Sequence, residues 1–213
     1  MVQGVIFDFD GVILDTETME YKIMNEIFAE NGAHLPIHLW EQRIGGNKNN
    51  FDPYAYLLRS SETAFSKAEL KAYKKKKVEE QLGMLQIMPG VEKLLEEASA
   101  KKIAIGLASS SPRKRVVELL SRYGLLRYFE YMATAEDVLH VKPYPDLYLH
   151  VLALMNLNPG DVFAIEDSPA GAKAAKSAGL FCVVVPNEVT KPLTFEPVNL
   201  KLNSLLELDL AKM

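Results

Sequence analysis

Short apolar runs alternate with longer segments along this chain, and the two kinds of segment differ in the spacing of their apolar residues. The short runs are rich in Val, Ile and Phe, which favour strands, and polar or small residues follow them. They predict buried strands at residues 5–7, 103–108, 131–134, 162–165 and 181–185.

The longer segments carry apolar residues at intervals of three and four, which is the spacing of one helix face. Val91, Leu94, Leu95 and Ala98 are an example. Helices are therefore predicted at residues 17–31, with Thr16 as the N-cap candidate, and at residues 53–58, 67–85, 91–100, 112–123, 145–155, 169–179 and 202–210. Strands that alternate with helices predict an α/β fold, in which helices cover both faces of a parallel sheet.

The segment between the first strand and residue 86 contains helical patterns and no strand pattern. Residues 15–85 are therefore predicted to form an all-helical domain inserted into an α/β core. The core is expected to consist of residues 1–14 and 86–213.

Composition excludes several classes of function. The apolar fraction of 48% and charged fraction of 24% are typical of a soluble globular protein, and a net charge of -4 gives no reason to expect nucleic acid or an acidic membrane as partner. Cys182 is the single cysteine, so no internal disulfide forms, and its apolar run predicts a buried thiol. No leader-like segment or membrane-length apolar run is present. We expect a cytoplasmic monomer.

Two acidic residues follow the first predicted strand. Asp8 and Asp10 are two positions apart, so both side chains point to the same side while the chain stays extended. Carboxylates at the end of a buried strand repel each other, and a divalent cation or a proton would remove the conflict. The alternative is that both are solvated loop residues.

Further polar residues follow other predicted strands. They are Ser109, Ser110, Ser111, Glu166 and Asp167, with Lys142 in a loop on the same side. Each has a simpler explanation, because the serines and acids could cap the next helix and the lysine could be solvated. Ligands of open parallel sheets bind beyond the carboxyl ends of the strands, so the shared placement favours one site.

The residue types in this predicted site suit phosphoryl transfer. Carboxylates from two strands supply the oxygen ligands that Mg²⁺ prefers. Ser109 and Ser110 offer hydroxyls near a helix start, which favours anion binding, and Lys142 adds a positive charge. An aspartate can act as nucleophile while a second acid transfers protons. Charge stabilisation is the main requirement of this chemistry, and a metal, an anion pocket, a cation and a second carboxylate together would supply it.

Four segments carry a family resemblance: DFDGVILDTE at 8–17, LASSSPRKR at 107–115, KPYPDLY at 142–148 and IEDSPAGAKAAKSAG at 165–179. Together they resemble the signature motifs of the haloacid dehalogenase (HAD) superfamily. They are most similar to the subgroup of beta-phosphoglucomutase and the phosphoglycolate-phosphatase-like enzymes. The resemblance covers the full chain and implies a Rossmann-like parallel-sheet core with an inserted helical cap that closes over the substrate.

The resemblance also implies roles at matching positions. Asp8 would be the nucleophile and Asp10 the general acid/base. Ser109 and neighbouring backbone would bind the phosphoryl group, and Lys142 would stabilise its charge and the nucleophile. Mg²⁺ would be bound by Asp8, the backbone carbonyl of Asp10 and Asp167. Glu166 would be a further ligand or would support one.

Two departures from the family pattern favour a phosphatase over a mutase. Beta-phosphoglucomutase carries a cap histidine where this chain has Glu20, and a cap arginine where it has Lys48. Lysine keeps the charge but cannot grip a second phosphate with two parallel hydrogen bonds. The dehalogenases of the superfamily lack an acid at the position of Asp10. We therefore expect a Mg²⁺-dependent phosphatase of small phosphorylated metabolites. Sugar phosphates are the best candidates for the substrate, and a sugar-phosphate mutase is the alternative function.

The inserted helices are expected to set substrate choice. The candidates there are Glu20, Arg43, Asn47 and Lys48, with one of the lysines at 74–77 as a further possibility. Each of them could equally be a surface residue. The sequence gives little support to two other functions. A non-catalytic binding protein has no feature in its favour, and the long insert does not suit a receiver-type phosphoacceptor.

Overall fold

The computed structural model describes residues 2–45 and 51–213. Its sheet has six strands in the order β3-β2-β1-β4-β5-β6, and every pairing is parallel. The strands are β1 (Gly4–Phe7), β2 (Ala104–Ala108), β3 (Tyr131–Ala133), β4 (Val162–Glu166), β5 (Phe181–Val184) and β6 (Leu200–Lys201). The predicted α/β class with a parallel sheet is confirmed.

The first strand lies at the centre of the sheet. β1 pairs with β2 on one edge and with β4 on the other, so that Phe7 is level with Leu107 and Ile165. The residues that follow these three strands therefore emerge side by side at one edge of the sheet. This register places the acidic and serine motifs together.

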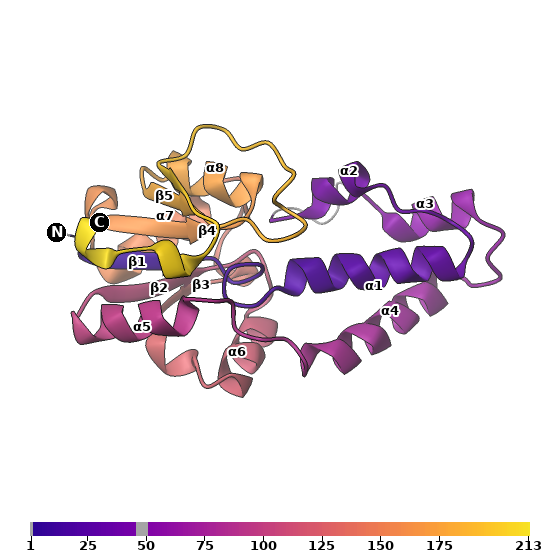
Figure 1. Cartoon of the computed structure of the whole chain (residues 1–213), viewed down its shortest axis with the longest axis horizontal. Helices are drawn as coiled ribbons and strands as arrows, with labels where there is room; N and C mark the ends of the chain where they lie inside the picture. Colours follow the sequence, from indigo (N-terminus) through magenta and orange to yellow (C-terminus); the bar gives the residue numbers. More distant parts are fainter. Residues whose placement is uncertain (1, 46–50) are drawn as a thin grey trace.

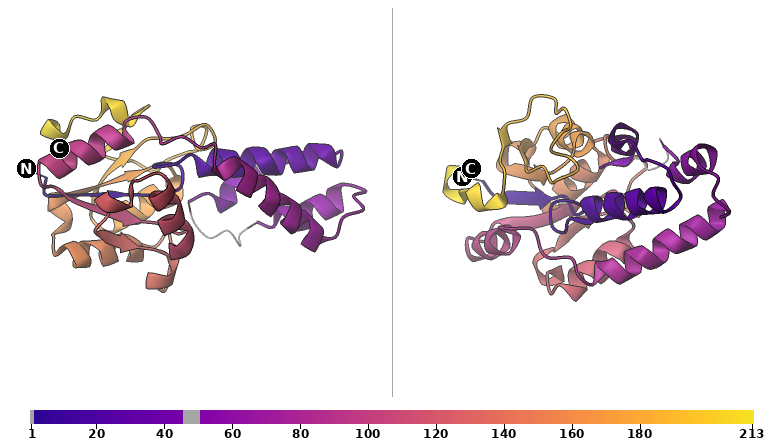
Figure 2. Two further views of the ribbon diagram at one scale, coloured as in Figure 1. Left: turned by 90° about the horizontal axis from the view of Figure 1, so that it is seen from below. Right: turned by 45° about the vertical axis from the view of Figure 1, so that its right-hand side comes forward.

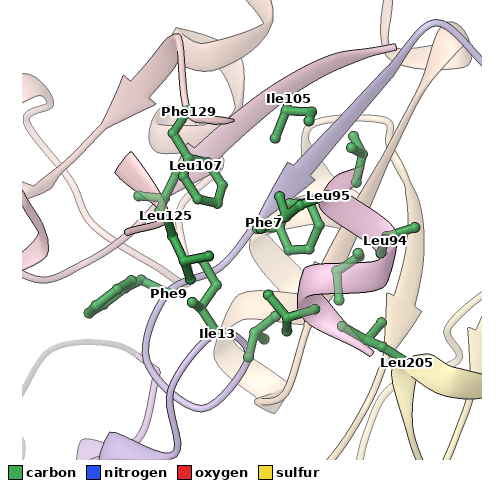
Figure 3. Close-up of a cluster of buried hydrophobic side chains, with 14 of the residues drawn as sticks. Phe7, Phe9, Ile13, Leu94, Leu95, Ile105, Leu107, Leu125, Phe129 and Leu205 are labelled. Carbon is green, nitrogen blue, oxygen red and sulfur yellow. The ribbon is translucent and has the colours of Figure 1, made fainter. Parts of the chain in front are cut away.

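Helices cover both faces of the sheet (Figure 1). These helices are α5 (Val91–Ala100), α6 (Arg113–Arg122), α7 (Asp146–Met155) and α8 (Pro169–Ser177). Successive β1 residues face opposite sides: Phe7 belongs to one apolar cluster, with residues of α5 and α6, and Ile6 to another, with residues of α7 and α8. Figure 3 shows the first cluster, in which the Phe7 and Phe129 rings meet edge to face at 5.9 Å.

The remaining α-helices extend beyond the sheet edge where the motifs emerge (Figures 1 and 2). They are α1 (Thr16–Glu30), α2 (Ile37–Trp40), α3 (Pro53–Ser60) and α4 (Lys67–Leu82), and we call them the cap helices. They bury their own apolar cluster, which includes Ile23, Phe28, Leu57 and Leu70. The exact limits of the predicted cap domain stay a prediction.

Capping residues begin three of these helices, and at α3 the Asp52 side chain accepts the backbone N–H groups of Tyr54 and Ala55. The Asp15 side chain accepts a hydrogen bond from the backbone N–H of Thr18, so the N-cap of α1 lies one residue before the predicted Thr16. Ser66 and Glu69 form a reciprocal capping box at the start of α4. Short 3₁₀ turns complete the fold: η1 (Glu41–Arg43), η2 (Leu126–Tyr128), η3 (Ala135–Asp137), η4 (Pro159–Asp161), η5 (Leu205–Glu207) and η6 (Leu210–Lys212).

The prediction of a final helix at residues 202–210 is wrong. The tail adds the edge strand β6 and then forms the 3₁₀ turns η5 and η6. Ser204 and Asp209 each accept a backbone N–H at the start of a turn, which interrupts a continuous helix. Leu205, Leu208 and Leu210 are buried in the sheet's apolar core, and this spacing suits two turns. Across the described ranges, no helix has the length and apolarity that a membrane crossing requires.

Candidate active site

The central strands bring three buried carboxylates together. Asp8 follows β1, while Glu166 ends β4 and Asp167 follows it. The backbone N–H of Asp8 donates to Ile165 O at 2.9 Å, which holds the two strand ends in register. One oxygen from each of Asp8, Glu166 and Asp167 lies within 4.8 Å of the others. Residues 158 positions apart in sequence therefore form one acidic cluster.

Lys142 supplies a buried positive charge to this cluster. Its Nζ lies 2.5 Å from Asp8 Oδ1 and 2.7 Å from Glu166 Oε1, and it sits over the Tyr148 ring at 5.3 Å from the centroid. Burial opposes the charged ammonium, but the charges of Asp8 and Glu166 outweigh it and raise the pKa of Lys142. Lys142 therefore stays protonated and bridges the two carboxylates.

A single ammonium does not balance three buried carboxylates. Burial raises the pKa of Asp8 well above its ordinary value, and Lys142 only partly opposes this shift. Burial, followed by the charges of Asp8 and Glu166, raises the pKa of Asp167. Each shift is the cost of holding negative charge away from water, and a divalent cation would remove it.

The hydrogen bonding of Asp167 also suits a metal ligand. Its Oδ2 accepts a hydrogen bond from Asn187 Nδ2 at 2.7 Å, whereas its buried Oδ1 has no hydrogen-bond partner among the described residues. A bare buried carboxylate oxygen is costly unless a cation binds it. Gly11 leaves the space for this carboxylate, since a Cβ there would lie 2.2 Å from Asp167 Oδ2.

The serine motif follows β2 beside the acids. Ser109 donates its backbone N–H to Ala133 O and accepts the N–H of Ser111 on its Oγ at 3.0 Å. The buried Ser110 Oγ has no hydrogen-bond partner among the described residues. An unsatisfied buried hydroxyl before a helix start suits an anion ligand. The predicted phosphate-binding role of Ser109 and Ser110 stays a prediction.

At least three groups among the described residues hold the Asp10 side chain. Thr16 Oγ1 donates to Asp10 Oδ1 at 2.5 Å and Ser111 Oγ donates to Oδ2 at 2.5 Å. Arg115 Nη1 forms an ion pair with Oδ1 at 3.2 Å. The sequence pattern indicates only a helix cap at Thr16 and no role for Arg115. The run of cations at residues 113–115 was the available signal for Arg115.

The predicted cap candidates have different surroundings. Glu20 pairs with Arg115 at 3.2 Å and with Lys74 at 2.7 Å, so it faces the core. Arg43 donates to the backbone carbonyl of Phe51 and lies over the Trp40 ring. Asn47 and Lys48 lie outside the described residues.

The lysine run on α4 divides between two environments. Lys74 approaches the core through Glu20, and Lys77 binds Glu26 and Glu30 of α1. The other two lysines of the run are exposed and pair along their own helix. Among contacts between described residues, only Lys74 of this run reaches a residue that also contacts the motifs.

Tyr148 and Asn187 support the acids and were not predicted. The Tyr148 hydroxyl donates to Glu166 Oε1 from α7, and Asn187 reaches Asp167 from the loop after β5. Asn187 lies two positions after the predicted strand at 181–185, so its place beyond a strand end was the available signal for it. Tyr148 follows no predicted strand, and its contact with Glu166 is known only from the folded arrangement.

An aspartate paired with a buried lysine and a cluster of carboxylates that could hold a cation lie beyond the carboxyl ends of a parallel sheet, and this arrangement suits phosphoryl transfer. The sequence profile of the family described as haloacid dehalogenase-like hydrolase matches residues 5–185. The chain belongs to this family, as its motifs predicted.

Known proteins similar to this chain are phosphatases and mutases of that family. "Putative phosphatase YhcW" of Bacillus subtilis is 42% identical over 99% of this chain and 96% of its own length. "Phosphorylated carbohydrates phosphatase" of Thermotoga maritima is 34% identical over 84% of this chain and 82% of its own. The crystal structure of beta-phosphoglucomutase from Clostridium difficile has a TM-score of 0.72 at 27% identity and covers 100% of this chain and 95% of its own. The predicted subgroup, and the class of phosphoric monoester hydrolase, are confirmed.

Proposed function

We propose that this protein is a magnesium-dependent phosphatase of phosphorylated carbohydrates that works through an aspartyl-phosphate on Asp8. The observation that carries the proposal is the contact of Asp8 with Lys142 inside a buried acidic cluster, with Asp10 held beside it. The Thermotoga relative, named for phosphorylated carbohydrates, supports the substrate class.

The reaction has two steps. In the first, a carboxylate oxygen of Asp8 bonds to phosphorus, the phosphorus–oxygen bond of the ester breaks, and Asp10 gives a proton to the departing oxygen. In the second, Asp10 takes a proton from water as the water oxygen attacks phosphorus. The bond to Asp8 then breaks, and inorganic phosphate leaves.

Lys142 and the serines bind the group that is transferred. The Lys142 ammonium neutralises charge on Asp8 and on the phosphoryl oxygens. Ser109 and Ser110, next to the start of α6, are the proposed phosphate contacts.

Mg²⁺ would be bound by Asp8, Asp167 and the backbone carbonyl of Asp10. The fit rests on the acidic cluster and on the bare Oδ1 of Asp167. When bound, the ion supplies charge neutralisation for the phosphoryl group. Glu166 contacts Lys142 and Tyr148 through Oε1 and the N–H of Asp167 through Oε2, so we assign it the support of Lys142 and Asp167.

A phosphate-release assay tests the proposal. We expect turnover of sugar phosphates with Mg²⁺, loss of turnover with EDTA and recovery on adding Mg²⁺. Asp8→Asn keeps the shape of the side chain and removes the nucleophile, so it should abolish turnover. Release of phosphate by Asp8→Asn at the native rate would refute the covalent mechanism.

The mutase alternative is tested on the same preparation. Its support is the structural similarity to beta-phosphoglucomutase. Phosphorus NMR of a sugar 1-phosphate distinguishes the two, because a mutase forms a 6-phosphate without net release. We expect inorganic phosphate as the product, since Glu20 places a carboxylate where that mutase has a histidine.

A further inference from the structure

Arg115 connects the motif acid Asp10 to the cap helices. It belongs to the first turn of α6, and its guanidinium uses two nitrogens for two carboxylates. Nη1 lies 3.2 Å from Asp10 Oδ1 and Nη2 lies 3.2 Å from Glu20 Oε1. A planar guanidinium keeps these two directions fixed relative to each other. The position of Asp10 is thus tied to a residue of α1.

The connection continues within the cap. Glu20 Oε2 pairs with Lys74 Nζ of α4 at 2.7 Å, so Glu20 is held from both sides. The side chains that form these ion pairs are only 13–23% exposed; they belong to Asp10, Arg115, Glu20 and Lys74. Ion pairs shielded from solvent in this way are weakened less by salt than surface pairs.

The location of Arg115 is unfavourable for its own helix. The helix N-terminus carries partial positive charge, yet α6 begins with Arg113, Lys114 and Arg115 and has no acid in its first turn. Arg113 is compensated by Asp137 at 2.6 Å, and Lys114 is exposed to solvent. Arg115 is compensated by Asp10 and Glu20, which suggests that these contacts account for its placement.

We propose that Arg115 is a positioning residue for Asp10, anchored by Glu20, that fixes the orientation of the Asp10 carboxyl group, which in its protonated form gives a proton to the departing oxygen. The inference rests on the proposed role of Asp10 as the general acid. It predicts that loss of Arg115 lowers kcat/KM most for substrates whose leaving group needs that proton. A sugar alkoxide needs it, whereas nitrophenolate leaves readily without it.

Arg115→Gln is the main test, with kcat/KM measured for a sugar phosphate and for p-nitrophenyl phosphate. The value of kcat/KM depends on the steps up to departure of the leaving group. It does not depend on the later hydrolysis of the aspartyl-phosphate, which both substrates share. General acid catalysis contributes about 10²- to 10⁴-fold, so we expect a loss of roughly 10- to 100-fold for the sugar phosphate and less than about threefold for the aryl ester. An equal loss for both substrates, or no loss for either, would overturn the proposal.

Two variants control for charge and shape. Arg113→Gln removes a cation from the same helix turn and should leave both substrates near the native rate. Arg115→Lys keeps the charge but cannot hold two carboxylates in a fixed plane, so it should recover only part of the lost sugar-phosphate activity. A loss in Arg113→Gln equal to that in Arg115→Gln would assign the effect to helix charge and refute positioning.

The anchoring role of Glu20 is tested by a double-mutant cycle. Glu20→Gln should reduce sugar-phosphate turnover selectively, and the double variant with Arg115→Gln should be no worse than Arg115→Gln alone. Fully additive losses would contradict the anchor. Circular dichroism and thermal melting establish that each variant is folded.

Direct substrate binding is the competing role for Arg115. In the inactive Asp8→Asn background, calorimetry measures the Kd of the sugar phosphate with and without Arg115→Gln. An unchanged Kd supports positioning, and a tenfold weaker one refutes it. Wild-type turnover with both substrates, abolished by Asp8→Asn, establishes the proposed function separately from this inference.

Discussion

Lys142 Nζ lies 2.5 Å from Asp8 Oδ1, although the two residues are 134 positions apart in sequence. The lysine side chain is 1% exposed and the aspartate side chain 5%, so the pair is almost completely removed from water. The same ammonium contacts Glu166, which makes it the counter-ion of two carboxylates.

Replacing Lys142 with Met should therefore harm both folding and turnover. Removing one partner of a buried ion pair leaves an uncompensated charge and costs about 3–5 kcal/mol. Chemical denaturation measures this loss, and the phosphate-release assay should show no turnover. Lys173→Met is the matched control, because its pair with Glu196 is exposed and should change stability by less than about 1 kcal/mol.

The metal-free protein should lose stability as pH rises. Burial raises the pKa of Asp8 and Asp167 in the folded state above the ordinary value of 3.8. A raised pKa means that the folded protein holds protons that the unfolded chain releases, so stability is fully present below pH 3.8 and is lost up to the raised pKa. Melting temperatures in EDTA should fall over this range.

Bound Mg²⁺ should oppose that fall, since it stabilises the charged carboxylates. Asp167→Asn removes one of the two titrating acids and should flatten the pH dependence in EDTA. The melting temperature in EDTA could instead stay constant or rise above pH 3.8, with a similar slope in Asp167→Asn. That result would show that burial does not raise the pKa of these two acids.

Gly11→Ala should abolish activity while Gly32→Ala should not. Both glycines have positive φ, +88° and +68°, so alanine strains the backbone at each by roughly 1–2 kcal/mol. The added Cβ meets Asp167 Oδ2 at 2.2 Å in the first case and nothing within 4 Å in the second. Stability and turnover are measured on both. Similar turnover in the two variants would contradict a tight fit at Asp167.

Tyr148→Phe should slow turnover modestly and lower stability. The variant removes the hydroxyl that donates to Glu166 Oε1, and a buried hydrogen bond to a charged group contributes about 1.5–3 kcal/mol. Lys142 still holds Glu166, so we expect several-fold slower turnover. Tyr144→Phe, at an exposed tyrosine of the same motif, should match the wild type in steady-state kinetics and melting temperature.

The sequence predicted the sheet and the strand-end motifs because their causes are local. Asp8, Ser109 and Asp167 each follow a short apolar run, and parallel pairing then brings the ends of those runs together. Lys142 could be added through its motif, although its contacts with two acids could not be known.

The residues that were missed depend on contacts between elements. Arg115 and Tyr148 point from helices towards acids on other segments, and helix periodicity carries no information about those partners. Asn187 lies in a loop with no regular pattern. The tail was predicted wrongly because its leucines are close enough to resemble a helix face, while polar caps divide it into two turns.

The separate apolar cluster of the cap helices has an evolutionary consequence. It includes Leu57 and Leu70 of the cap helices and Val189 of the loop after β5 but no strand residue, so mutations there reach the sheet edge that carries the motifs only indirectly. A lineage can thus explore new substrates by altering these helices while the reaction chemistry is inherited unchanged. Arg115 marks where that independence ends, because a change at Glu20 is transmitted to Asp10.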